Sequence, residues 1–178
     1  LRVTPQTLAL WDERARLQGR GADWRLSDAQ LQATQMALLG DGSDGQDLWI
    51  FGYGSLTWDP GFHFSEVRLA VLPAHRRRFS CRTVLGRGSP ERPGLMLTLE
   101  PGEGDCHGLA FRIDATHAAH ECGMVWRREM IRAIYRPCLL PVHTPQGEVD
   151  ALVFAANTEH ADHVGKLTLD EAADIIAR

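Results

Sequence analysis

The sequence predicts an α+β domain built on a mixed or antiparallel, barrel-like sheet with few helices, preceded by an N-terminal helical extension. Residues 1–45 show helical patterns followed by a glycine-rich acidic stretch. From residue 46 onward, short strand-like runs alternate with Gly and Pro punctuation. Many strands with few helices, not in strict alternation, are typical of this fold class.

The N-terminal extension and linker are expected to span residues 1–45, and the main domain residues 46–178. An apolar stripe indicates a first helix, and Ser27 with Gln30 forms a capping box that begins a second helix. Residues 40–47, GDGSDGQD, have no apolar periodicity and predict a linker or mobile loop. The stripe consists of Leu8, Trp11, Ala15 and Leu17.

The main domain contains seven predicted strands and two predicted helices. One helix begins near Asp114 and continues to about residue 134. The other begins at Thr168, with Glu171 as its capping-box partner. The strands are expected at 48–51, 67–72, 79–84, 95–99, 107–113, 135–142 and 149–155.

Composition limits the class of partner. The chain has 178 residues and a formal net charge of -4, which argues against nucleic acid and favours a small molecule or a protein. Neither a signal peptide nor an apolar run of membrane-spanning length is present in the sequence, so we expect a cytoplasmic protein without a membrane partner. The cysteines lack close spacing and predict reduced, buried thiols: Cys81, Cys106, Cys122 and Cys138.

A turn with two glycines, Gly52 and Gly54, directly follows the first predicted strand. Glycines permit positive φ values and close approach of the backbone to a ligand, and consecutive N–H groups in such a turn can bind an anion. The pattern is not a dinucleotide fingerprint, because Thr57 stands where a third glycine is needed. A tight turn under aromatic packing fits the same spacing, so both interpretations stay open.

Glu129 lies on the apolar stripe of the central helix, with Cys122, Val125 and Trp126. A carboxylate that faces the core is partly desolvated and its pKa is raised, which suits a group that accepts and returns a proton. A surface glutamate that pairs with Arg132 at i+3 fits the same pattern. The stripe alone leaves both readings open.

The run FGYGSLTW at residues 51–58 resembles the FGYGSLxW signature of the ChaC family, the glutathione-specific γ-glutamylcyclotransferases. The likeness continues in order over about 130 residues and implies a γ-glutamylcyclotransferase-like fold. Its further segments are Gly86-Arg87-Gly88, Pro93-Gly94, Gly108-x-Ala110-x-Arg112, Trp126-x-Arg128-Glu129-Met130 and Tyr135.

This resemblance implies a lyase that cleaves glutathione to 5-oxoproline and Cys-Gly by attack of the α-amino group on the γ-carbonyl. Glu129, in the R-E-M segment, would be the general acid and base. The chemistry needs no metal, no organic cofactor and no serine nucleophile, and Ser55 does not stand in a G-x-S-x-G elbow. The implied substrate-binding residues are Tyr53, Gly54, Ser55, Leu56, Arg82 and Tyr135.

The sequence departs from the family pattern in two places. The family usually has a glycine just before Tyr135, where Ala133 and Ile134 stand here, and this difference is expected to narrow the entrance. The family also continues beyond the late helix that residues 165–176 resemble, so we expect the C-terminal end to be shortened. A cyclotransferase for another γ-glutamyl amine and a non-catalytic binding or regulatory protein remain the alternatives; a glutamate at 129 argues against the second.

The basic stretch from 74 to 94 is a second candidate binding surface, because glutathione has two carboxylates. Strand alternation places Arg82 opposite Arg77, and only Arg82 has a place in the family pattern. Two histidine pairs have i, i+3 spacing but no third ligand at a recognisable spacing, and therefore predict surface histidines and no metal site. They are His117 with His120 and His160 with His163.

Overall fold

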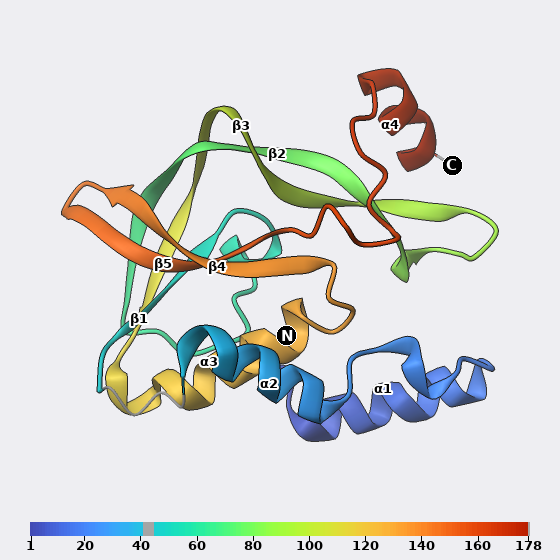
Figure 1. Cartoon of the computed structure of the whole chain (residues 1–178), viewed down its shortest axis with the longest axis horizontal. Helices are drawn as coiled ribbons and strands as arrows, with labels where there is room; N and C mark the ends of the chain where they lie inside the picture. Colours follow the sequence, from blue (N-terminus) through green and yellow to red (C-terminus); the bar gives the residue numbers. More distant parts are fainter. Residues whose placement is uncertain (41–44, 178) are drawn as a thin grey trace.

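The computed structural model describes residues 1–40 and 45–177, so residues 41–44, half of the predicted linker, lie outside the described residues. Within these ranges the strands form a closed barrel in the order β1-β3-β2-β4-β5 (Figure 1). β1 and β5 pair in parallel and the other neighbours antiparallel, which confirms the predicted mixed, barrel-like sheet. The strands are β1 (Leu48–Gly52), β2 (Glu66–Gly88), β3 (Pro93–Ile113), β4 (Tyr135–Thr144) and β5 (Gly147–Ala156).

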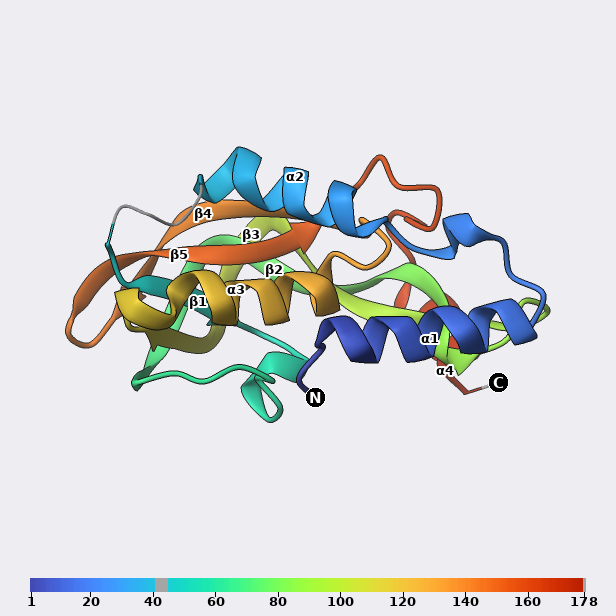
Figure 2. The ribbon, with the colours of Figure 1, turned by 90° about the horizontal axis from the view of Figure 1, so that it is seen from below.

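α1, α2 and α3 lie on one side of the barrel, whereas α4 lies on the other side of the long β2–β3 hairpin (Figure 1). α2 and α3 run along the barrel, and α1 continues beyond the end of α3 beneath this hairpin (Figures 1 and 2). The capping boxes predicted at Ser27 and Thr168 are confirmed, and Thr4 forms a third. No helix in the described ranges has both the length and the apolar character needed to cross a membrane. The helices are α1 (Pro5–Leu17), η1 (Ala22–Trp24), α2 (Asp28–Leu39), η2 (Ser55–Thr57), α3 (Ala115–Glu129) and α4 (Leu169–Ile176).

β2 and β3 each join two runs that the sequence predicts as separate strands, so the prediction of short strands is wrong here. The basic and glycine-rich stretches between the apolar runs continue the ladder, and Arg76 is the register partner of Glu100. The register shifts between Pro73 and His75, and such bulges restart the alternation of side chains without ending the pairing. The apolar alternation in the sequence is therefore interrupted at residues where the strand itself continues.

The central helix α3 ends at Glu129, earlier than predicted. Met130 caps it, and Ala133 adopts a φ of 53°, in the left-handed region that glycine occupies without strain. The chain reaches the start of β4 at Tyr135 through this turn. As a result, Glu129 lies at the end of the helix and next to the mouth of the barrel.

The core has two parts. One fills the barrel, and the other lies between the barrel wall and the helices. Leu8 and Leu31 of the N-terminal helices belong to the second part together with Trp126 and Phe154, so the extension packs onto the barrel. Leu8 and Ala15 of the predicted stripe are buried, whereas Leu17 is 73% exposed, contrary to the prediction. All four cysteines are free, and only Cys138 is not fully buried.

Candidate active site

The carboxyl group of Glu129 is withdrawn from solvent. The stripe of α3 faces the core as predicted, with Cys122, Val125 and Trp126 buried, and only 12% of the Glu129 side chain is exposed. Burial raises the pKa of Glu129 to about 7, and the charge of Arg128 limits this rise. The alternative pairing with Arg132 is not formed, because Arg132 bonds to Asp162 at 2.8 Å.

Two tyrosines lie beside this carboxyl group. β1 and β5 run parallel and β4 runs antiparallel to β5, so the end of β1 and the start of β4 meet at one end of the barrel. Tyr53 follows β1 and donates a hydrogen bond to the carbonyl oxygen of Phe154 at 2.8 Å. Burial raises the pKa of both Tyr53 and Tyr135, and the nearby charge of Glu129 raises each further. Both phenols are therefore neutral hydrogen-bonding groups.

The glycine turn lies at the same end of the barrel. A Cβ at Gly54 would meet no atom within 4 Å, so the space beside the turn is open. A Cβ at Gly52 would lie 3.0 Å from the Phe111 ring, so this glycine serves close packing. Neither glycine has a positive φ, and that expectation is wrong: Gly54 has a φ of -134°. Here glycine provides room, and no left-handed turn is needed.

Arg128 connects the turn to the carboxyl group. Its Nη2 donates to Oγ of Ser55 at 2.9 Å, its Nη1 donates to the carbonyl oxygen of Asp59 at 2.6 Å, and its Nε lies 3.2 Å from Oε1 of Glu129. Only 14% of its side chain is exposed. The sequence pattern predicts no role for Arg128. The one feature of the sequence that points to this residue is its position beside Glu129 in the W-x-R-E-M segment.

The structure thus brings together Glu129, Tyr53, Tyr135 and, through Arg128, Ser55. Leu56 is buried in the core cluster beneath the turn, with 6% of its surface exposed. The structure does not place Arg82 with this group. Arg82 is exposed on β2 and lines a separate hollow of about 750 Å³. Its contact with substrate stays a prediction.

A loop after β5 holds the segment that links Glu129 to Tyr135. Asn157 donates its Nδ2 to the carbonyl oxygen of Ala133 at 3.1 Å, and the ring of His160 bonds to the carbonyl oxygen of Arg132 at 2.9 Å. The Nε2 of His163 lies 2.9 Å from Oε1 of Glu100. His160 and His163 are therefore partly buried structural groups, and the prediction that they lie on the surface is wrong.

The remaining histidine pair, His117 and His120, is exposed as predicted. Among the described residues, no group of three or more His, Cys, Asp and Glu side chains is placed to hold a metal ion.

A closed mixed barrel with a carboxyl group withdrawn from solvent at one end is the architecture of γ-glutamyl cyclotransferase structures. The protein has the fold of the glutathione-specific γ-glutamyl cyclotransferase from yeast, whose crystal structure superimposes with a TM-score of 0.67 over 75% of this chain and 79% of that chain, at 21% identity. The ChaC-like protein family model matches residues 48–178. The chain therefore belongs to the ChaC-like family.

Curated relatives agree with this assignment. The chain is 34% identical over 152 residues to the glutathione-specific gamma-glutamylcyclotransferase of Escherichia coli, covering 85% of this chain and 65% of the relative. It is 32% identical over 134 residues to glutathione-specific gamma-glutamylcyclotransferase 1 of Danio rerio, covering 73% of this chain and 68% of that protein. The chain spans less than two thirds of the length of the E. coli relative.

Proposed function

We propose that this protein is a lyase of the γ-glutamylcyclotransferase type that converts glutathione to 5-oxoproline and Cys-Gly. The observation that supports this most is the position of Glu129: a buried carboxyl group with a pKa of about 7, joined through Arg128 to an open glycine turn. The names of the E. coli and Danio rerio relatives give the substrate. Under this proposal the partner is a small molecule, and the cytoplasmic location predicted from the sequence applies.

The reaction requires one proton carrier. Glu129 in its ionised form takes a proton from the α-ammonium group of the γ-glutamyl unit, and the freed amine attacks the γ-carbonyl carbon to close a five-membered ring. After the attack the ring nitrogen carries a positive charge and a second proton. As the tetrahedral intermediate collapses and the bond to the cysteinyl nitrogen breaks, Glu129 gives its proton to the leaving amine, and its freed carboxylate then takes the second proton from the ring nitrogen. A carboxyl group with a pKa near 7 is suited to both steps, because acceptance and return of the proton are then nearly balanced.

The surrounding groups position the substrate. Because the attacking amine and the carbonyl belong to the same molecule, correct placement supplies much of the rate. The open space beside Gly54 accommodates the γ-glutamyl end, and Tyr135 offers a neutral hydroxyl group to it. Tyr53 donates a hydrogen bond to the carbonyl oxygen of Phe154, so its own oxygen can accept a hydrogen bond from the substrate ammonium group. Arg128 fixes the distance between the turn and Glu129.

Replacement of the base tests the proposal. Glu129→Gln keeps the shape of the side chain but cannot carry the proton, so release of 5-oxoproline from glutathione should fall by about 10²- to 10⁴-fold. Binding of glutathione, measured by calorimetry, should persist. Glu103→Gln, an exposed change on β3, is the matched control and should leave turnover unaltered.

Undiminished turnover in Glu129→Gln would remove the proposed base. A panel of γ-glutamyl compounds separates the alternatives. Equal turnover of other γ-glutamyl amines would reject glutathione specificity, whereas binding without any 5-oxoproline would identify a non-catalytic member of the fold.

A further inference from the structure

A hollow beside the candidate active site is lined by the N-terminal segment, which lies outside the region matched by the family model. Its volume is about 480 Å³, within the usual range for small-ligand sites. Arg128 and Ile131 form the wall nearest Glu129, and Val84 of the β2–β3 hairpin forms another wall. The opposite side consists of residues from α1 and η1. The hollow therefore begins where the candidate active site ends.

The lining of this hollow is basic and aromatic. Arg14 and Arg20 supply positive charge, Trp11 and Trp24 supply indole rings, and no acidic residue of the described ranges lines this hollow, whereas the charge of Arg128 is shared with Glu129 and Asp59. In a chain with a net charge of -4, two arginines without an acidic residue in the same hollow favour an anion there, although the larger hollow next to it has Asp23 in its lining.

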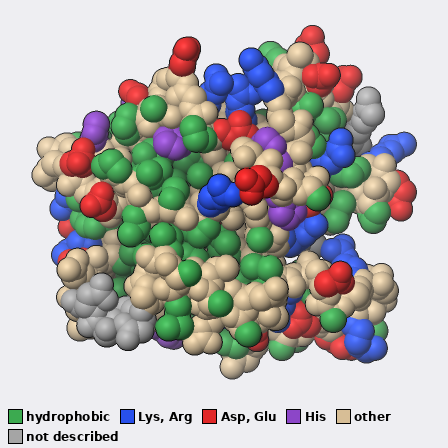
Figure 3. Space-filling view, in the orientation of Figure 1, with side chains coloured by type: hydrophobic (Ala, Val, Ile, Leu, Met, Phe, Trp, Pro, Cys, Tyr) green, Lys and Arg blue, Asp and Glu red, His purple; other side chains and the backbone are tan. Residues whose placement is uncertain are grey.

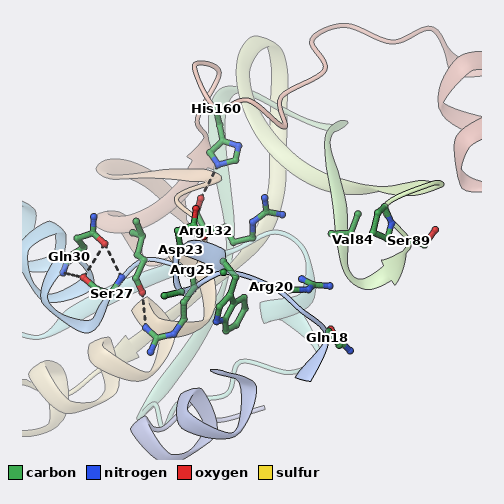
Figure 4. Close-up of a pocket in the computed structure, with 16 residues that line it drawn as sticks. Gln18, Arg20, Asp23, Arg25, Ser27, Gln30, Val84, Ser89, Arg132 and His160 are labelled. Carbon is green, nitrogen blue, oxygen red and sulfur yellow. Dashed lines mark hydrogen bonds between the residues drawn. The ribbon is translucent and has the colours of Figure 1, made fainter. Parts of the chain in front are cut away.

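Among the described residues, no acidic side chain holds Arg20, in contrast to two neighbouring arginines. Arg25 is held by Asp12 and Asp28, and Arg132 is held by Asp162. The guanidinium group of Arg20 forms no hydrogen bond or ion pair with any residue in the described ranges, although the residue is half-buried. In the close-up, Arg20 extends from the N-terminal segment toward the side that bears Val84 and Ser89 (Figure 4).

Arg20 also lines a second, larger hollow of about 1210 Å³, which shares Trp24 and Val84 with the first. The space-filling view shows the surface indented between the hairpin and the N-terminal segment (Figure 3). The two hollows thus form one continuous depression that leads from solvent to Arg128. A substrate can enter along it with its charged end beside Arg20.

We propose that Arg20, assisted by Arg14, binds the carboxylate at the far end of the substrate's leaving group, and so selects γ-glutamyl peptides that end in a free carboxylate. This inference rests on the proposed function and extends it. The leaving group of glutathione is a dipeptide, whose extended length is about 7 Å at 3.3 to 3.6 Å per residue. If the γ-glutamyl end lies beside Gly54 and the leaving group extends past Arg128, its carboxylate enters the hollow that Arg128 and Arg20 both line.

The assignment also distinguishes two candidate clamps. The sequence favours Arg82 in the basic stretch, but Arg82 lines the other hollow, near α4. Arg20 lies in the hollow that Arg128 borders. Arg82 is exposed to solvent, whereas the guanidinium group of Arg20 is half-buried and faces this hollow, where it can form a bidentate bond with a carboxylate.

The test compares glutathione with its C-terminal amide, which lacks the far carboxylate. Arg20→Gln should raise KM for glutathione about tenfold, with kcat nearly unchanged. This is the change in affinity expected when one hydrogen bond to a charged group is lost. KM for the amide should be the same in Arg20→Gln and in the unaltered protein. Arg16→Gln removes an equal charge from the exposed face of α1, where Arg16 bonds to Glu13, and should change neither value.

An unchanged KM for glutathione in Arg20→Gln, or an equal rise for both substrates, would overturn the subsite. A selective rise in Arg82→Gln alone would place the clamp on β2 instead. If the unaltered protein makes no 5-oxoproline, the proposed function itself fails. Calorimetric binding of glutathione and its amide to Glu129→Gln, with and without Arg20→Gln, still tests the subsite in that case.

Discussion

The two buried carboxyl groups of α3 have opposite environments although they lie on one helix. Glu121 is met by the guanidinium group of Arg2 at 2.9 and 3.0 Å and by the backbone N–H of His63 at 2.9 Å. Burial tends to raise its pKa, but these partners outweigh burial, and the pKa is lowered. At Glu129 burial outweighs the single charge of Arg128, and the pKa rises to about 7. Partners decide whether a buried carboxyl group stabilises the fold or can exchange protons.

The largest expected difference between the two groups is the pH dependence of stability. The pKa of Glu129 in the folded protein is about 7, against an ordinary value of 4.5, so between these values the folded state binds more protons than the unfolded state. The contribution of Glu129 to the free energy of unfolding is therefore fully present below this window. It is lost as pH rises through the window, by about 3 kcal/mol at 1.36 kcal/mol per pKa unit. Denaturation in urea across this window measures the effect.

Glu129→Gln should flatten this part of the profile and raise the free energy of unfolding above neutral pH. The pH dependence of stability that comes from Glu121 has the opposite sign. Its contribution to the free energy of unfolding is present above pH 4.5 and is lost as pH falls through its lowered pKa. A profile that keeps its slope in Glu129→Gln would show that the carboxyl group is more solvated than its burial indicates.

Loss of the paired carboxylate is the next largest effect. Glu121→Gln removes the negative charge that accepts hydrogen bonds from Arg2 and from the backbone N–H of His63. The free energy of unfolding should therefore fall by about 2 kcal/mol near pH 7. The rate of 5-oxoproline release per folded molecule should not change. Glu13→Gln, which breaks an exposed pair on α1, is the control and should leave stability unaltered. Lost activity in fully folded Glu121→Gln would contradict the division of roles.

The smallest expected effect concerns the turn that follows Glu129. Ala133 has a φ of 53°, and an alanine there is strained, so Ala133→Gly should raise the free energy of unfolding by up to about 1 kcal/mol. Ala173→Gly, within α4, should have the opposite effect, because glycine weakens a helix interior. If both changes lowered stability equally, Ala133 would not be strained.

The sequence pattern predicted much of the site because its signals are local. The apolar stripe of α3 indicated the core side for Glu129 but left a surface pairing with Arg132 open, and the resemblance of the FGYGSLTW run and the R-E-M segment to the ChaC family favoured a substrate-binding turn and a catalytic Glu129. Arg128 and Arg20 were missed because their significance depends on segments far along the chain. Arg128 bonds to Ser55 and Asp59, and Arg20 faces a hollow partly walled by Val84. Neither hydrophobic periodicity nor motif spacing predicts contacts between segments so far apart in the sequence.

Periodicity and capping thus determined, from the sequence alone, the starts of α2 and α4 and the apolar side of α3, since each depends on residues a few positions apart. The order of strands and helices along the chain predicted the mixed sheet. Tertiary structure decided the rest. Closure of the barrel brought Tyr53 and Tyr135 to one mouth, and the arrival of Arg2 at Glu121 left Glu129 as the carboxyl group with a raised pKa. The physical reason is that desolvation and charge pairing depend on which distant groups surround an atom, and only the folded chain sets those surroundings.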